Sequence, residues 1–166
     1  MAKHIWSVLC ERMLEDPVSK AVSLMEVREA IVLRPPLPQI GSGQNLLGIP
    51  IRMQLVSYWT KSEEAGTEEF NLRATVRLPD GRTVALPTVH PVFSTSNYRQ
   101  QFAFDSMPYV GPGRYWFFVE SSGDGKKWEP AAEIPFEIKT DHAVEPSEGE
   151  PPRRAPKPKK KKMAAS

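Results

Sequence analysis

The segment EEFNLRATVRLPDGRT, residues 68–83, decides the fold class. Its apolar and polar side chains alternate with a period of two, which is typical of a strand that buries one face. The apolar positions are Phe70, Leu72, Ala74, Val76 and Leu78. The pair Asp80-Gly81 that follows predicts a tight hairpin turn, because glycine accepts a positive φ. This segment therefore predicts an antiparallel hairpin with one buried face.

The same kind of pattern extends along most of the chain. In AEIPFEIK, residues 132–139, Pro135 lacks an N–H group, which predicts an edge strand or a proline nitrogen on the free side of a strand. Further strand patterns occupy residues 4–14, 21–33, 49–61, 82–89, 98–105 and 113–122. Helix is an alternative only in the first two of these segments, and their clustered β-branched residues favour strands. We expect an all-β fold, an antiparallel two-sheet sandwich of about eight strands.

The end of the chain differs in composition from the rest. The 166 residues suffice for one domain with a real core. Residues 141–166 contain no aromatic side chain, are rich in proline, and place an acidic stretch before a basic one. Such a segment buries too little apolar surface to offset chain entropy. The sequence therefore predicts a β-sandwich domain at residues 1–140 and a disordered, basic Pro/Lys-rich tail at residues 141–166.

The basic excess of the chain sits in this tail. Of 22 basic and 20 acidic residues, seven basic and four acidic ones follow residue 140, so the domain holds 15 against 16. A domain that binds nucleic acid with its folded surface is expected to carry a basic face of its own. The favoured interpretation is a solubilising tail, and the alternative is weak nucleic-acid association without sequence preference. The basic residues of the tail are Arg153, Arg154, Lys157, Lys159, Lys160, Lys161 and Lys162.

Cysteine content and hydropathy indicate the compartment. Cys10 is the one cysteine in the sequence, so no intramolecular disulfide is available. The N-terminus MAKHIWSVLCERM interrupts its apolar residues with charges, and no apolar run approaches the roughly 18 residues of a membrane span. We expect a soluble, cytoplasmic protein without membrane partners.

Several segments together resemble a known family. These are LCERMLEDPVSKAVSLMEVREAIVL at residues 9–33, PPLP at 35–38, LVSYWTK at 55–61 and PGRYWFFVESSGDGKKWEPAAEIPFEI at 112–138. They resemble small bacterial proteins classed as a domain of unknown function, with a Cys-Glu pair on the first strand and a closing Pro-Gly-x-Tyr hairpin. The resemblance covers roughly residues 5–139 and implies a β-sandwich. It implies no catalytic residues and no activity.

The strand RYWFFVE, residues 114–120, carries aromatic side chains on both faces. Tyr115, Phe117 and Val119 share one face, while Trp116 and Phe118 share the other. A strand of a two-layer sandwich buries one face, so the second needs a cover. In one interpretation the loop between the second and third long strands covers it, through Leu37, Ile40, Leu46 and Leu47. In the other, Trp116, Phe118 and Tyr58 form an exposed patch for a protein partner or a second copy. The same rings suit a sugar, but nothing in the sequence selects carbohydrate.

Metal and catalytic signatures are weak in this sequence. The histidines His4, His90 and His142 lack zinc-ligand spacing. Cys10 could form a nucleophile pair with His4 or His90, although a buried structural thiol is the favoured interpretation. No nucleophile elbow, phosphate-binding loop or dinucleotide fingerprint occurs.

Two further patterns have an ordinary explanation. The glutamates of the first predicted hairpin, Glu11, Glu26 and Glu29, could form paired carboxylates, but ion pairing with Arg12 and Arg28 is favoured. Pro35 and Pro38 have the spacing of a polyproline ligand, although loop stiffening is favoured. We expect a non-enzymatic binding or adaptor module without metal or cofactor, whose partner-binding residues are Trp116, Phe118 and Tyr58.

Overall fold

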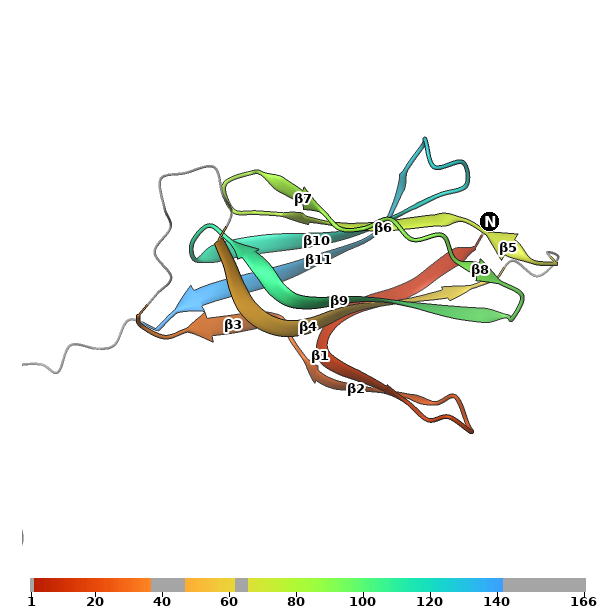
Figure 1. The fold of residues 1–166 in the computed structure, drawn as a ribbon, viewed down its shortest axis with the longest axis horizontal. Coiled ribbons are helices and arrows are strands. Elements are labelled where there is room, and N and C mark those ends of the chain that lie inside the picture. Colours follow the sequence, from red (N-terminus) through yellow and green to blue (C-terminus); the bar gives the residue numbers. More distant parts are fainter. Residues whose placement is uncertain (1, 37–46, 62–65, 142–166) are drawn as a thin grey trace, which may run out of the picture.

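The computed structural model describes residues 2–36, 47–61 and 66–141, and these residues form an all-β sandwich (Figure 1). One sheet has the strand order β2-β1-β4-β9 and the other the order β3-β11-β10-β6-β7. The first comprises β1 (Lys3–Glu15), β2 (Val22–Val27), β4 (Leu47–Thr60) and β9 (Asn97–Tyr109). The second comprises β3 (Ala30–Leu33), β6 (Asn71–Arg77), β7 (Thr83–Ala85), β10 (Gly113–Ser122) and β11 (Glu129–Thr140). The short pair of β5 (Glu68–Glu69) and β8 (Val92–Phe93) lies beside them.

The predicted all-β sandwich is confirmed, with more strands than expected. Residues 21–33, predicted as one strand, divide at Arg28 and Glu29 into β2 and β3, which belong to different sheets. β3 pairs in parallel with β11, so this pair departs from the predicted antiparallel arrangement. Strands joined by a tight hairpin are antiparallel, whereas β3 and β11 are far apart in the sequence and can pair in parallel.

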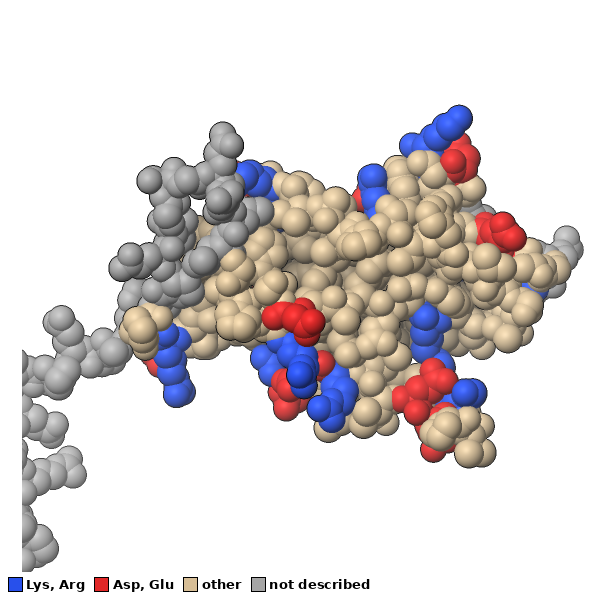
Figure 2. Space-filling view, in the orientation of Figure 1, with Lys and Arg blue, Asp and Glu red and all other residues tan. Residues whose placement is uncertain are grey.

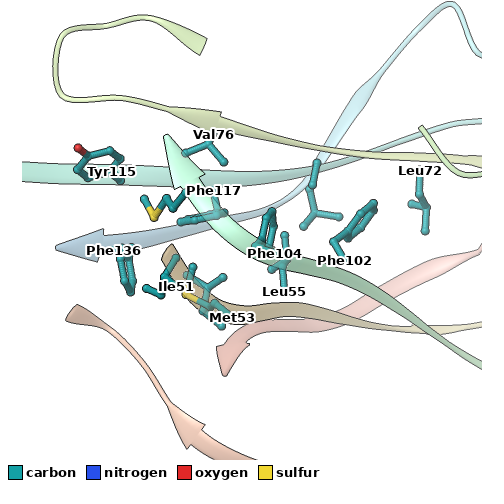
Figure 3. Close-up of a cluster of buried hydrophobic side chains, with 14 of the residues drawn as sticks. Ile51, Met53, Leu55, Leu72, Val76, Phe102, Phe104, Tyr115, Phe117 and Phe136 are labelled. Carbon is teal, nitrogen blue, oxygen red and sulfur yellow. The ribbon is translucent and has the colours of Figure 1, made fainter. Parts of the chain in front are cut away.

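The core lies between the two larger sheets and follows the predicted alternation (Figure 3). Leu72, Ala74 and Val76 of β6 are buried, as are the inward residues of β10. The Phe117 ring packs edge-on against Phe104 at 5.8 Å and against Phe136 at 6.0 Å between ring centres. Large aromatic and aliphatic side chains from both sheets therefore interdigitate in one cluster.

Glycine turns follow β6 and β10, and the first of them forms as predicted. Asp80-Gly81 closes the β6–β7 hairpin, with Gly81 at a φ of 86°, and the Asp80 carboxylate accepts the Arg82 N–H at 3.0 Å. The side chain of Arg82, followed by its N–H, holds the pKa of Asp80 below the ordinary value. In the turn after β10, Gly125 has a φ of 71°. Only glycine adopts these conformations without strain.

The β9–β10 turn explains the Pro-Gly-x-Tyr pattern in physical terms. Gly113 has a φ of 142°, and a Cβ on it would lie 3.2 Å from the side chain of Pro79. The buried Tyr115 hydroxyl donates to the Gly111 carbonyl at 2.8 Å and accepts the Val110 N–H at 3.2 Å. The glycine thus permits a close approach, and the tyrosine secures the turn.

The first hairpin folds back over the outer face of the four-stranded sheet. β1 bends near its middle, so that its second half and β2 run beneath β4 and β9 (Figure 1). Gln54 of β4 accepts the Met13 N–H at 2.8 Å, and Glu15 lies 3.6 Å from Arg99 of β9. This cover explains why Val56 and Cys10, which face away from the core cluster, are both fully buried.

The described residues form no helix with the length and apolar character to cross a membrane. The predicted tail, from residue 142 on, lies outside the described residues.

Candidate binding groove between strands β1 and β11

A groove of about 470 Å³ lies where the two sheets meet at the side of β1 and β11. The crossover from β2 to β3 bounds it. Its lining residues are Ser7, Val8, Leu9, Val27, Arg28, Glu29, Arg114, Trp116, Ile134, Pro135, Phe136 and Glu137. The groove exists because residues 21–33 divide: β2 pairs with β1 only from Cys10 on, and β3 pairs with β11 only from Glu137 on.

The wall formed by β1 presents unpaired backbone to the groove. The Leu9 carbonyl accepts the Arg28 N–H at 2.9 Å, so the backbone of Leu9 points away from β4. Alternate residues of a strand point the same way, so Ser7 directs its N–H and C=O to this side as well. Within the described residues no strand pairs with Lys3–Val8 here.

The wall formed by β11 is partly blocked by proline. The Glu137 N–H donates to the Glu29 carbonyl at 2.9 Å, away from β10. By alternation Glu133 and Pro135 direct their backbones to the same side, where Pro135 has no N–H to offer. Of the two predicted placements, the free side is the correct one: β11 lies inside its sheet, but its proline nitrogen faces an unpaired stretch.

Arginines cover the aromatic rings of the outer face of β10, which adjoins the groove. The Arg77 guanidinium lies 4.9 Å from the Phe118 ring centre and 5.9 Å from that of Trp116. Arg114 lies 5.9 Å from Trp116 on the groove side. Trp116 and Phe118 are consequently half-buried. Neither predicted alternative describes this cover, because the cations come from positions opposite or beside the rings in the same sheet.

The three predicted partner-binding residues do not form one surface. Trp116 and Phe118 lie together on the outer face of the five-stranded sheet, as their alternation indicated. Tyr58 belongs to the other sheet, where its ring stacks on Trp6 at 5.4 Å and lies 5.4 Å from Arg99. The described part of the structure does not include the predicted covering residues Leu37, Ile40 and Leu46 or the side chain of Leu47.

The charges at the groove are unevenly partnered. Arg28 pairs with Glu11 and, at 2.9 Å, with Glu26, so the predicted ion pairing is confirmed at Arg28. Arg12 and Glu29, also included in that prediction, form no ion pair with a described residue. Hydrogen bonding to Glu26 and to Arg28 lowers the pKa of Glu11. Arg114, in contrast, forms no ion pair with any residue that the structure describes. It is the cation at the groove that has room for an acid from outside.

Three hydrogen-bonded polar side chains reach the groove at Ser7. His4 Nε2 lies 2.8 Å from Ser7 Oγ, which lies 2.8 Å from the buried Ser57 Oγ. The imidazole packs edge-on against Trp59 at 5.0 Å. Burial lowers the pKa of His4, and a hydrogen bond with the Trp6 backbone opposes this shift. Sequence reasoning could not find these linked side chains, because Ser57 is 50 residues from Ser7.

The structure places Cys10, the thiol of the predicted nucleophile pair, inside the protein. Cys10 is fully buried opposite Gln54 and Val27, and burial raises the pKa of its thiol. His4 lies opposite Trp59, further along β1. Among the described side chains no group of three or more His, Cys, Asp or Glu residues is placed to hold a metal ion.

Sequence reasoning missed the functional interest of Arg77, Arg114 and Ser7. Arg114 had a usable signal, because it precedes Trp116 by two residues on one strand and therefore shares its face. Arg77 had none, because its place opposite Trp116 depends on the pairing of β6 with β10. The basic residues proposed for nucleic acid, Arg153 to Lys162, lie outside the described residues, so that alternative stays a prediction.

Fold and groove together define a two-sheet β-sandwich with an open side. No protein-family model matches the chain, and no curated protein matches it in sequence.

Proposed function

We propose that the protein is a non-enzymatic, cytoplasmic binding module that takes up an extended segment of another protein in the groove between β1 and β11. The observation that carries this proposal is the position of Trp116. This ring is half-buried on the outer face of β10 and also lines the groove, beside backbone that pairs with no described strand.

The side chains around the groove have the composition of a binding site. Tryptophan and arginine are enriched among residues that dominate binding energy, because both bury large areas and still form polar contacts. Trp116 with Arg114 at one rim supplies this pair. Glu137, opposite Arg114 on β11, pairs with Lys139 at 3.2 Å, and Arg114 forms no ion pair with a described residue. The expected segment therefore presents a carboxylate to Arg114.

The backbone of β1 offers a second means of recognition. A segment added along Ser7 would continue the line of β2, which leaves β1 at Cys10. Such strand addition draws affinity from main-chain hydrogen bonds and specificity from alternate side chains that enter pockets. The segment's apolar side chains would then meet Leu9 and Ile134, both of which line the groove.

We favour binding over catalysis because two candidate catalytic groups, one in the groove and one beside it, already have partners. Arg28 is engaged by Glu11 and Glu26, and His4 by Ser7. A general base needs an unobstructed path to the proton it removes from a substrate.

The proposal is tested by selecting peptides from a displayed random library on the full chain and measuring their dissociation constants by fluorescence anisotropy. We expect the selected peptides to carry an acidic residue near apolar ones. Trp116→Ala should raise the dissociation constants of these peptides about tenfold or more, as for a central anchor residue. Arg114→Ala should also weaken peptide binding, because the contact with the peptide carboxylate is lost. Tyr58→Ala, on the other sheet, is the matched control and should leave the dissociation constants unchanged.

Thermal unfolding of each variant separates lost binding from lost folding. Peptides that bind Trp116→Ala and Arg114→Ala as tightly as the wild type would contradict the proposal, as would a selection that yields no binder.

A further inference from the structure

Strand β9 forms an open edge on the opposite side of the sandwich from the groove. It pairs with β4 along Asn97–Tyr109, and within the described residues no strand pairs with its other side. A hollow of about 200 Å³ separates β9 from residues 86–89, so this neighbouring segment does not close the edge.

The direction of each backbone group along β9 follows from one hydrogen bond. The Lys61 N–H donates to the Ser96 carbonyl at 2.9 Å, and the register with β4 continues unchanged from there to Phe104. The backbone N–H and C=O groups of even-numbered residues therefore bond to β4. Those of odd-numbered residues from Arg99 to Asp105 point away from β4, toward the open edge. In agreement, the side-chain amide of Gln100 reaches the Gln101 carbonyl at 2.9 Å.

Between Arg99 and Asp105 this edge lacks proline and lysine, two devices that normally prevent strand pairing, and Pro108 lies beyond this stretch. Natural proteins protect edges with prolines, lysines, bulges or short strands. The unpaired stretch of β11 carries Pro130 and Pro135, whereas Arg99–Asp105 holds neither proline nor lysine. Figure 2 shows mostly uncharged surface over β9.

We propose that β9 pairs antiparallel with β9 of a second copy of the chain, about a two-fold axis at Phe102. Only outward-pointing residues can exchange backbone hydrogen bonds across the edge, so odd-numbered residues must face odd-numbered ones. The register centred on Phe102 meets this condition and places Gln101 opposite Ala103 of the second copy. It also places Arg99 opposite Asp105 of the second copy, and the symmetry repeats both contacts.

Charge complementarity selects this register. Arg99 and Asp105 lie on the same, outer face of β9, since Phe102 and Phe104 face the core. Directly opposite residues of an antiparallel pair share a face, so the two charges meet. Asp105 is exposed and has no hydrogen bond or ion pair with another described residue. Glu15, 3.6 Å away, holds the Arg99 side chain beside the edge.

The test is sedimentation velocity of the full chain over a range of concentrations. We expect a wild-type dimer. Asp105→Arg should raise its dissociation constant by about tenfold, because like charges then face each other at two symmetric positions. The exchange variant Arg99→Asp/Asp105→Arg should restore the wild-type constant. Glu15→Gln, which removes the internal partner of Arg99 but leaves β9 unchanged, should keep the dimer.

Thermal unfolding of every variant checks that the fold persists. A chain that stays monomeric at all concentrations overturns the proposal, and so does a dimer that Asp105→Arg leaves unchanged. Failure of the exchange variant to restore a dimer that Asp105→Arg has weakened overturns the register. The groove proposal is independent, because Trp116→Ala should leave the dimer intact.

Discussion

The hydroxyl of Tyr115 donates to the carbonyl of Gly111, four residues earlier, at 2.8 Å inside the core. This contact secures the β9–β10 turn, and the same oxygen accepts the Val110 N–H. Tyr115→Phe should therefore lower the free energy of unfolding by about 1–3 kcal/mol, since a buried carbonyl and a half-buried N–H lose their partner. Urea denaturation measures the change.

Tyr58→Phe is the control for this substitution, because no hydrogen bond to the Tyr58 hydroxyl is present among the described residues. A Tyr115→Phe variant as stable as Tyr58→Phe would show that the turn does not depend on this contact.

The arginine cover of the outer face predicts a change in surface properties. Arg77 lies over Phe118 and Trp116 and pairs with Glu133 at 3.6 Å. Arg77→Ala should expose both rings, raising the fluorescence of a bound hydrophobic dye, while costing only about 0.5–1 kcal/mol of stability. Arg82→Ala, in the β6–β7 turn, should not increase dye binding. Equal dye fluorescence in both variants would mean that other groups cover the rings.

The burial of Cys10 predicts that its thiol reacts slowly with reagents in the native state. Cys10 has no exposed surface, and burial raises the pKa of its thiol, so little thiolate is present or accessible at neutral pH. We expect no reaction with a disulfide reagent in the native state and one equivalent after unfolding in guanidinium. Thr88→Cys, at an exposed position, should add a thiol that reacts at once in the native state. Rapid native reaction of the wild type would show that the hairpin cover opens.

The pH dependence of stability should reflect His4. Its folded-state pKa lies below the ordinary value of 6.5, so as pH falls the unfolded chain takes up this proton first. The contribution of the neutral His4 imidazole to folding stability is fully present above pH 6.5. It declines as pH falls toward the folded-state pKa. His4→Gln should flatten the decline in unfolding free energy between about pH 6.5 and pH 5.

That range avoids the carboxylates with lowered pKa. Asp80 and Asp124, held by turn hydrogen bonds, protonate at more acidic pH and affect stability only there. An unchanged slope in His4→Gln would assign the dependence to another group.

The strand pattern was predictable because it is local. The alternation in residues 68–78 and 113–122 places every second side chain in the core, whatever the rest of the chain does. Asp80-Gly81 likewise specifies its turn through backbone conformation alone. The division of residues 21–33 was not predictable, because each half is a good strand and only the sheet it joins tells them apart.

The candidate site depended on contacts between distant segments. Trp116 and Phe118 were found from alternation along one strand, but their cover by Arg77 requires the pairing of β10 with β6. Tyr58 was assigned to the same surface because no local signal says to which sheet a strand belongs. Its actual place, on the other sheet near the fold-back of β1 and β2, depends on a bend that no single residue predicts.

By itself, the sequence determined that the chain forms strands, which side chains face the core and where the tight turns lie, because these follow from interactions within a few residues. The tertiary structure alone decided that β2 and β3 separate to leave a groove, that arginines shield the outer rings, and that β9 is left as an open edge. Those features depend on which strands become neighbours, and that is settled by the packing of the whole core.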